Sequence, residues 1–246
     1  MDIQHNSTKK IAIFVEGLTE FIFISHFIQI ITNYTATIKE LELYANKYRN
    51  SHVGGINFNN PASAVEFLII KVGNDEQVLA AIKERANKLG KEGYNIILGL
   101  RDMYSESYKK QSSNKVDPNT TKKFIEGAKK TIEDMGLAQL QIDIFFLIME
   151  IEAWFLAMWE IFEKINSTHT RSYIENKLGI NLSNLEGYFQ PSKEIKKIIT
   201  DYKKKEGQIK KIVSQVDNII IDNVIDEKRC QAYNCFISKM KSLIDI

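Results

Sequence analysis

The sequence predicts an α/β protein built on a doubly wound, mainly parallel β-sheet, with a mainly helical C-terminal region. Continuous apolar runs at residues 11–15 and 67–72 indicate strands that are buried on both faces, as in parallel sheets. Segments with helical spacing of apolar residues alternate with these runs, which is typical of βαβ units. Strand-like runs become scarce after residue 164, where basic helical segments follow.

Capping residues and breakers set the expected element bounds. Thr19 can cap the first helix, and Asn74 with Gln77 forms a capping-box pattern for the second. Asp117-Pro118 is a helix start, and Gly136 is a helix stop. We expect exposed polar connections at residues 46–60 and 104–116. We expect strands at residues 11–15, 35–44, 67–72, 94–100 and 140–148, and helices at 21–32, 75–89, 118–135 and 150–162.

The weakening of the strand pattern predicts two parts. Residues 1–163 would form the α/β domain, and residues 164–246 a helical C-terminal region that packs on it. Within that tail, the apolar run at 218–221 is a short strand candidate.

Composition excludes several classes of protein. Apolar residues make up 44% and charged residues 26%, so the chain is not disordered, and 33 basic against 31 acidic residues leave a net charge of only +2. The sequence shows no signal peptide, membrane span, P-loop, Rossmann glycine motif or GxSxG elbow, and its four histidines are scattered. We therefore expect a cytoplasmic protein without membrane association.

Acidic residues follow three of the predicted strands. Because parallel strands end at one sheet edge, these carboxylates would converge there, and a bound Mg²⁺ would relieve their repulsion. The residues are Glu16, Glu20, Asp102, Glu150 and Glu152.

Structural roles compete with this metal hypothesis. Arg101 can pair with Asp102, which would make that carboxylate a simple surface charge. Glu20 lies in a first helical turn, where a carboxylate favours the helix dipole. Glu150 and Glu152 begin a helix as well, so a capping role is equally open for both.

Residues 187–211 form a local basic segment. Its eight lysines stand against three acids, and Tyr188, Phe189 and Tyr202 are interleaved with them. Lysines could follow a phosphate backbone while an aromatic ring stacks on a base. A solvated lysine face is the alternative.

The chain resembles the Toprim family at four motifs. Residues 11–20 are similar to its first motif, in which a glutamate and a glycine follow strand one. Asp102 matches the first aspartate of the family's Asp-x-Asp, but Tyr104 replaces the second. A Toprim-like bacterial family of anti-phage defence loci, related to OLD nucleases, has Asp-x-Tyr here, Glu-x-Glu-Ala as at 150–153 and Pro-Ser-Lys as at 191–193. The resemblance covers about residues 10–200.

The resemblance implies a Mg²⁺- or Mn²⁺-dependent nuclease that cuts RNA, such as tRNA, or DNA as a defence effector. Glu16 would be the general acid/base and a metal ligand, and Asp102 the main metal ligand. Glu152 or Glu150 would complete the metal site, Glu20 is a further candidate ligand, and Lys193 would contact the scissile phosphate. The expected substrate contacts are Arg101, Tyr104, Lys203, Lys204 and Lys205.

Two other functions stay open at this point. One is a non-catalytic Toprim-like module that binds a partner protein or nucleic acid, which the altered second aspartate favours. The other is hydrolysis or transfer of a small phosphate at the same carboxylates, which would not need the basic segment. The resemblance also suggests a partner ATPase or sensor protein, and cutting of both strands would favour a homodimer.

Overall fold

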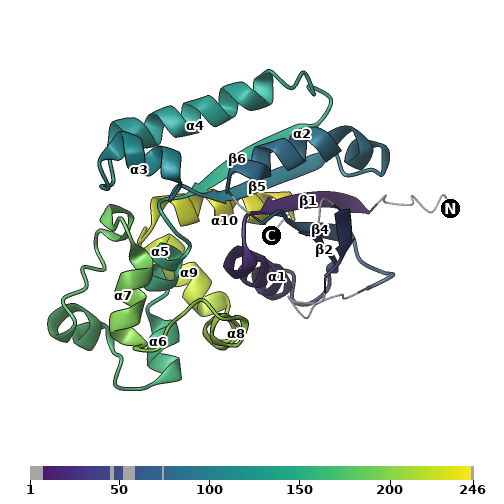
Figure 1. Cartoon of the computed structure of the whole chain (residues 1–246). Helices are drawn as coiled ribbons and strands as arrows, with labels where there is room; N and C mark the ends of the chain where they lie inside the picture. Colours follow the sequence, from purple (N-terminus) through teal and green to yellow (C-terminus); the bar gives the residue numbers. More distant parts are fainter. Residues whose placement is uncertain (1–7, 45–46, 52–58, 74, 245–246) are drawn as a thin grey trace. The chain divides into compact units, whose positions relative to one another are not determined.

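A computed structural model describes residues 8–44, 47–51, 59–73 and 75–244 of the chain. Figure 1 shows its helices and strands, with the labels used from here on. The strands are β1 (Lys9–Val15), β2 (Thr37–Tyr44), β3 (Lys47–Asn50), β4 (Val65–Lys71), β5 (Ile96–Asp102) and β6 (Gln141–Leu147).

The six strands form one sheet in the order β3-β2-β4-β1-β5-β6. β1 pairs in parallel with β4 and β5, and β2 pairs in parallel with β4. Only β3, at the edge, is shown to be antiparallel to its neighbour. The predicted α/β class with a mostly parallel sheet is therefore confirmed.

Helices connect the strands and make up the whole regular structure of the C-terminal part that is described. The α-helices that lie between strands are α1 (Leu18–Ile31), α2 (Asp75–Lys91), α3 (Glu106–Ser112) and α4 (Pro118–Glu133). Those after the sheet are α5 (Glu152–Ala157), α6 (Glu160–Ile165), α7 (Pro191–Ile198), α8 (Glu206–Val213), α9 (Asn218–Asp226) and α10 (Gln231–Leu243). No helix in the described ranges has both the length and the apolarity that a membrane crossing requires.

The chain divides into two compact units that are each discontinuous in sequence. The first unit comprises residues 1–100 and 129–144, and the second comprises residues 101–128 and 145–246. The division therefore does not coincide with the boundary predicted between residues 163 and 164. The reason is that the segments after β5 and β6 pack with the helical tail rather than with the first four strands.

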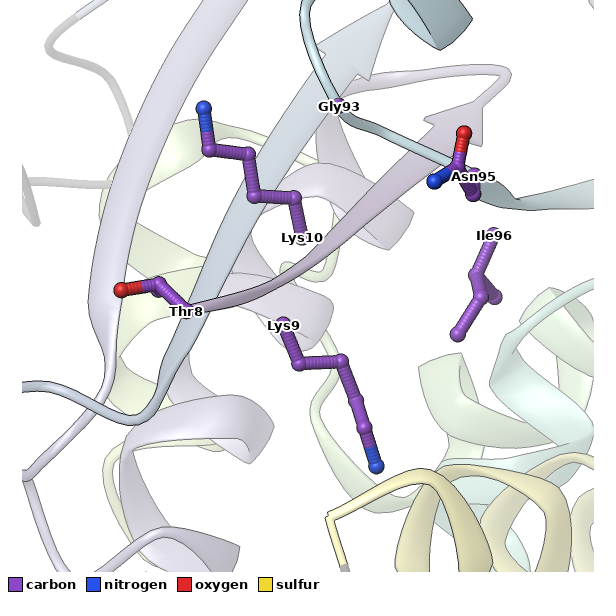
Figure 2. Close-up of a pocket in the computed structure, with 6 residues that line it drawn as sticks. All are labelled: Thr8, Lys9, Lys10, Gly93, Asn95 and Ile96. Carbon is purple, nitrogen blue, oxygen red and sulfur yellow. The ribbon is translucent and has the colours of Figure 1, made fainter. Parts of the chain in front are cut away.

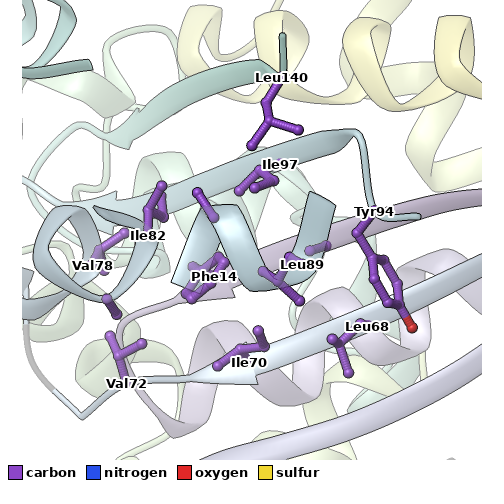
Figure 3. Packing of buried hydrophobic residues seen from close by; sticks show 13 residues of the cluster. Phe14, Leu68, Ile70, Val72, Val78, Ile82, Leu89, Tyr94, Ile97 and Leu140 are labelled. Atoms are coloured by element: carbon purple, nitrogen blue, oxygen red, sulfur yellow. The ribbon is translucent and has the colours of Figure 1, made fainter. Parts of the chain in front are cut away.

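The core of the first unit is apolar on both faces of β1. Ala12 and Phe14 pack toward α2, where Val78 and Ile82 meet them at helical spacing (Figure 3). α1 lies on the other side of the sheet (Figure 1). Full burial on both faces explains why β1 reads as a continuous apolar run rather than an alternating one.

Gly99 leaves room for a neighbouring side chain in this core. A Cβ atom at this position would lie 2.3 Å from Cδ1 of Ile144 and 3.0 Å from Cδ1 of Ile82. A glycine within a strand, which is unfavourable by propensity alone, is therefore required by packing.

Aromatic side chains organise the core of the second unit. Trp154 of α5 is fully buried, with its ring centroid 5.2 Å from that of Tyr233 and 5.6 Å from that of Phe236, both in α10. Tyr108 of α3 packs edge-on against Phe124 of α4 at 5.3 Å. Contacts between residues far apart in sequence thus define this unit.

Two short elements differ from the sequence prediction in the connections. Within the expected loop at 46–60, residues 47–50 form the edge strand β3, and residues 52–58 lie outside the described residues, as does Asn74 of the expected capping box. In the expected polar connection at 104–116, α3 forms because the Ser105 hydroxyl accepts from the Tyr108 amide at 3.2 Å and the Tyr108 ring is buried. Neither β3 nor α3 contains an apolar run from which the sequence could have predicted it.

Two predictions for the helical part were wrong in detail. The helix expected at 150–162 is broken into α5 and α6, because the Arg229 guanidinium donates to the Ala157 carbonyl at 2.9 Å and removes it from the helical ladder. The strand candidate at 218–221 is the start of α9. There the Asp217 carboxylate accepts from the Ile220 amide at 2.9 Å, which caps the helix.

Candidate acidic site at the ends of β5 and β6

The segments that leave β5 and β6 run side by side in the second unit. The Met103 amide donates to the Leu147 carbonyl at 3.0 Å, and the Tyr104 amide donates to the Met149 carbonyl at 3.1 Å. These two hydrogen bonds place Asp102 and Glu150 on adjacent stretches of backbone. The structure therefore brings together the two segments that carry these acidic residues.

Glu150 is buried, and both of its carboxylate oxygens have partners. Its Oε1 accepts from Lys204 Nζ at 2.7 Å. Its Oε2 accepts from the Ser192 amide at 3.2 Å, in the first turn of α7. The carboxylate therefore satisfies an amide at the start of a helix, where negative charge is favoured by the helix dipole.

Glu152 is fully buried and is held by the connection between α7 and α8. The Tyr202 hydroxyl donates to Glu152 Oε1 at 2.7 Å, and Lys204 Nζ lies 3.0 Å from Glu152 Oε2. A buried carboxylate requires such compensation, since leaving it without a hydrogen bond or counter-charge would be strongly unfavourable. Lys204 thus bridges both glutamates.

Burial and charge act in opposite directions at this bridge. Burial is the largest influence on Glu152 and raises the pKa of its carboxyl group, while Lys204 and Tyr202 oppose that rise. Burial alone would lower the pKa of Lys204, but the charges of Glu152 and Glu150, with a smaller contribution from Asp102, raise it above its usual value. Lys204 is therefore a firmly protonated cation among three carboxylates.

Two residues at this cluster have a left-handed backbone. Met149, directly before Glu150, has a φ of 70°, and Lys204 has a φ of 53°. Non-glycine residues adopt this conformation at a cost of about 1–3 kcal/mol each. Strained backbone conformations of this kind occur where the surrounding structure holds a side chain in a required position.

Tyr104 forms an aromatic corner beside the acidic cluster. Its hydroxyl accepts a hydrogen bond from the Gln190 side chain, and its ring lies edge-on to Phe189 at 5.3 Å. Lys109 Nζ lies 4.1 Å from the centroid of the same ring. Arg101 places its guanidinium 5.5 Å from the centroid of Phe146. The structure thus gives both predicted substrate contacts a packing role.

Glu16 and Glu20 belong to the first unit. Glu16 is half-buried directly after β1, and its carbonyl accepts from the Gly73 amide at 2.8 Å. Glu20 is buried, and its Oε2 accepts from the Gly17 amide at 3.0 Å, which caps α1. The structural role in the first helical turn that was the alternative for Glu20 therefore agrees with its observed contact.

The basic segment divides into paired and unpaired lysines. Lys197, Lys204 and Lys210 contact carboxylates, whereas the others are exposed and form no ion pair with any described residue: Lys193, Lys196, Lys203, Lys205 and Lys211. Lys204 thus differs from the expectation of a surface substrate contact. Tyr202, expected as a base-stacking ring, is buried instead and bonds to Glu152.

A divalent metal does not fit the two glutamates as they are arranged. Three of the four carboxylate oxygens of Glu150 and Glu152 accept a hydrogen bond from the chain, and the fourth, Glu152 Oε2, lies 3.0 Å from the Lys204 ammonium without a hydrogen bond. Within the part of the chain that the structure describes, no three histidine, cysteine, aspartate or glutamate side chains are grouped so that they could hold a metal. An ammonium group is the cation at this position.

A shallow groove lies at the opposite end of the first strand. Thr8 and the first residues of β1, Lys9 and Lys10, line one side of it. Gly93 and Asn95, which precede β5, and Ile96, its first residue, line the other, around a volume of about 570 Å³. The two lysines point to opposite sides of the strand (Figure 2), and Lys10 donates to the Glu92 carbonyl at 3.0 Å. The groove is at the amino ends of the strands, not the edge where sheet ligands bind.

Three residues of the acidic cluster were missed as partners of the carboxylates: Ser192, Tyr202 and Lys204. All three lie about 40–54 residues along the chain from the glutamates they contact. The available signal was a tyrosine and lysines between two amphipathic helices, which indicates an exposed basic loop equally well.

The fold and site together define an α/β protein with a buried lysine–carboxylate cluster at the carboxyl ends of two strands. Comparison with protein-family models, with curated proteins and with solved structures finds no match for this chain.

Proposed function

We propose that this protein is a metal-dependent nuclease of the Toprim type, which hydrolyses phosphodiester bonds in RNA or DNA with Mg²⁺ or Mn²⁺ as cofactor. The observation that carries the proposal is the pairing of Glu150 and Glu152 with one lysine at the ends of β5 and β6, where the charge of Asp102 also acts on that lysine. Ligands of open α/β sheets bind at this edge. Groups of buried, mutually perturbed ionisable residues are also typical of functional sites.

The proposal assigns a role to each candidate residue. Glu16 would accept the proton of the attacking water, and Asp102 would be the main metal ligand. Glu20, Glu150 and Glu152 are the further candidate ligands, and the two last would have to exchange their contacts with Lys204 for the metal. Lys193, exposed next to Ser192 at the start of α7, would contact the scissile phosphate. Exposed Lys203 and Lys205 would hold the nucleic-acid backbone, since lysines bind it through its phosphates.

The biological setting that the Toprim resemblance suggests is anti-phage defence in the bacterial cytoplasm. A nuclease with this role needs control, because unrestrained cleavage would damage the host. A partner ATPase or sensor protein would supply that control, and a homodimer would suit the cutting of two strands.

A cleavage assay tests the proposal. Wild type, Glu16→Gln and Asp102→Asn would be incubated with tRNA, single-stranded RNA and plasmid DNA, with Mg²⁺, Mn²⁺ or EDTA. We expect metal-dependent cleavage of at least one substrate, reduced at least about 100-fold in each variant, the range typical for the loss of a general base. Glu84→Ala, an exposed glutamate of α2, is the matched control and should cleave like wild type.

The exposed lysines separate a nuclease from an enzyme that acts on small phosphates. The double variant Lys203→Met/Lys205→Met should weaken nucleic-acid cleavage. It should also reduce the slope of log activity against log salt concentration by about two, because two fewer lysines contact phosphates. Lys83→Met/Lys88→Met removes two exposed lysines from α2 and should change neither property. Equal activity of both double variants would favour a small phosphate substrate.

A non-catalytic Toprim-like module that binds nucleic acid or a partner protein is the second candidate function. The specific observation in its favour is Lys204, which already neutralises part of the acidic cluster without a metal. Nucleic-acid binding that persists in Glu16→Gln and Asp102→Asn, with no cleavage by wild type under any metal condition, would support this module and contradict the nuclease.

A further inference from the structure

The connection between α7 and α8, residues 199–205, carries three consecutive lysines with two different surroundings. The ammonium of Lys204 lies 2.7 and 3.0 Å from carboxylate oxygens of the two buried glutamates of the acidic cluster. Lys203 and Lys205, on either side of it, are exposed and form no ion pair with any residue that the structure describes. The connection therefore has one lysine bound to the core and two that face solvent.

Hydrogen bonds to the first turns of α8 hold the backbone of this connection. The Gln208 side chain accepts from the Lys203 amide and donates to the Asp201 carbonyl, each at 2.8 Å. The Gln208 amide in turn donates to the Lys205 carbonyl at 2.9 Å. Between these contacts, Lys204 has a left-handed backbone with a φ of 53°. The two exposed lysines thus extend from a backbone that is held on both sides of the buried one.

The same cluster also joins the connection to the start of α7. Glu150 accepts from Lys204 Nζ through Oε1 at 2.7 Å and from the Ser192 amide through Oε2 at 3.2 Å. One carboxylate group therefore lies between the two segments. Lys193, directly after Ser192, is exposed and is brought near the connection by this contact.

The solvent side of the connection offers charge without an aromatic ring. Tyr202 is its only aromatic residue, and the ring is buried with its hydroxyl donating to Glu152 at 2.7 Å. The exposed charges of residues 199–205 are the ammonium groups of Lys203 and Lys205 and the carboxylate of Asp201. Contacts between lysines and phosphates position a nucleic acid but do not read its bases.

We propose that residues 199–205 form a preformed phosphate-binding loop, which contacts the backbone of a nucleic acid whatever its base sequence. Lys203 and Lys205 are the contacting cations, and Lys204 and Gln208 are positioning residues that act through them. A loop that is ordered before binding loses less conformational freedom when the ligand arrives, which favours affinity. The inference rests on the proposed function for the nature of the ligand, but it requires neither a metal nor cleavage.

Binding in EDTA tests the contacting residues. Fluorescence anisotropy would follow single-stranded RNA and DNA oligonucleotides of equal length and different base sequence. Lys203→Met/Lys205→Met should weaken binding at least about fivefold, by the same factor for every sequence, and reduce the slope of log affinity against log salt by about 1–2. Asp201→Asn removes the opposing charge and should strengthen binding severalfold. Lys83→Met/Lys88→Met, in α2, is the matched control and should bind like wild type.

A neutral substitution tests the positioning role. Gln208→Ala removes no charge but frees the Lys203 amide and the Asp201 carbonyl, so binding should weaken at least about threefold. Gln215→Ala, which removes a glutamine contact to the Lys211 carbonyl at 3.4 Å, is the control and should bind like wild type. Urea unfolding checks that both variants are folded under the assay conditions.

A double-mutant cycle separates positioning from direct contact with phosphate. In the Gln208→Ala background, Lys203→Met/Lys205→Met should cost less affinity than in wild type, because the exposed lysines are no longer held in place. Lys204→Met should also weaken binding, and Lys204→Arg should restore it, since the arginine keeps a cation between the glutamates. Additive losses across the cycle would contradict the positioning role.

Four results would overturn the inference: no nucleic-acid binding by wild type, wild-type binding by the double lysine variant, equal binding by Gln208→Ala and Gln215→Ala, or losses that differ strongly between base sequences. These outcomes are separate from that of the cleavage assay. The expected binding pattern in a protein that cleaves nothing would sustain the loop while the nuclease proposal fails. Metal-dependent cleavage that none of these variants changes would overturn the loop and leave the nuclease in place.

Discussion

Two lysine–glutamate contacts of nearly equal length behave in opposite ways in the two units. Lys71 Nζ lies 2.9 Å from Glu42 Oε2 in the first unit, and Lys204 Nζ lies 3.0 Å from Glu152 Oε2 in the second. The hydrogen bond from Lys71 is the largest influence on Glu42, and the pKa of its carboxyl group is lowered. At Glu152, burial is the largest influence, and the pKa is raised.

Burial, not distance, separates these contacts. The Glu42 side chain is 13% exposed on β2 and keeps part of its hydration, whereas Glu152 is fully enclosed. Removal of a carboxylate from water is so unfavourable that a single lysine does not restore its usual acidity. The Lys71–Glu42 ion pair of the first unit therefore keeps contact with water, while Glu152 of the second unit has its charge within the core.

The largest expected effect comes from removing the buried lysine. Lys204→Met leaves Glu150 and Glu152 without their shared cation. Loss of one partner of a buried ion pair costs about 3–5 kcal/mol, and the partial exposure of Lys204 reduces the expected loss to about 2 kcal/mol. Urea unfolding at pH 7 measures this change in the free energy of unfolding.

Two further variants sharpen the comparison. Lys71→Met should lose less than about 1 kcal/mol, because Glu42 retains Arg49 at 2.7 Å and some contact with water. Adding Glu152→Gln to Lys204→Met should recover part of the lost stability, since it removes a buried charge. Equal losses for Lys71→Met and Lys204→Met would show that burial does not distinguish the two contacts.

An intermediate effect is expected at the tyrosine that bonds to Glu152. Tyr202→Phe removes one hydroxyl donor from a buried charged acceptor, which should lower the free energy of unfolding by about 1–2 kcal/mol. The matched control is Tyr188→Phe, because the Tyr188 hydroxyl accepts from the Asn181 amide on the surface at 2.6 Å. Urea unfolding that finds the larger loss in Tyr188→Phe would contradict the central role of burial.

The smallest effect concerns Glu42 and depends on pH. Its carboxyl pKa is lowered in the folded state from an ordinary value of 4.5, so the ionised form stabilises the fold. This contribution is fully present above about pH 5 and is lost as the pH falls through the folded-state pKa. Glu42→Gln should therefore be less stable than wild type by about 0.5–1 kcal/mol at pH 7, and the difference should shrink below pH 4.5.

Thermal unfolding of both proteins at pH 7, 5 and 3.5 measures this convergence. Glu92→Gln, an exposed glutamate at the end of α2 whose distance to Lys88 is 3.9 Å, is the control. A Glu42→Gln difference that stays constant from pH 7 to pH 3.5 would show that the carboxylate charge does not stabilise the first unit.

The sheet could be predicted from the sequence because its strands follow local rules. β1 and β4 are buried on both faces, so hydrophobicity alone identifies them, and α2 follows from apolar residues at helical spacing. β3 could not be found in this way, since an edge strand needs few apolar residues. The break between α5 and α6 depends on Arg229, which lies 72 residues from the carbonyl it contacts.

The site was predictable only at its acidic half. The carboxyl ends of parallel strands meet at one edge of a sheet, and this rule predicts that the segments of Asp102 and Glu150 lie close together. Lys204 and Tyr202 reach Glu152 through the fold of the tail, and their sequence surroundings are those of a solvated loop. A lysine on an exposed loop and a lysine inside a core have the same local sequence pattern. The burial of Lys204 is therefore visible only in the structure.

The interleaving of the two units has a consequence for protein synthesis. As the chain leaves the ribosome, the first unit is incomplete until residue 144 has emerged, although most of its strands appear within the first 100 residues. Residues 101–128 must then wait for helices as late as α10, which ends at Leu243, before their own unit can close. The nascent chain therefore holds exposed apolar segments for most of its translation, when domains usually fold as they emerge.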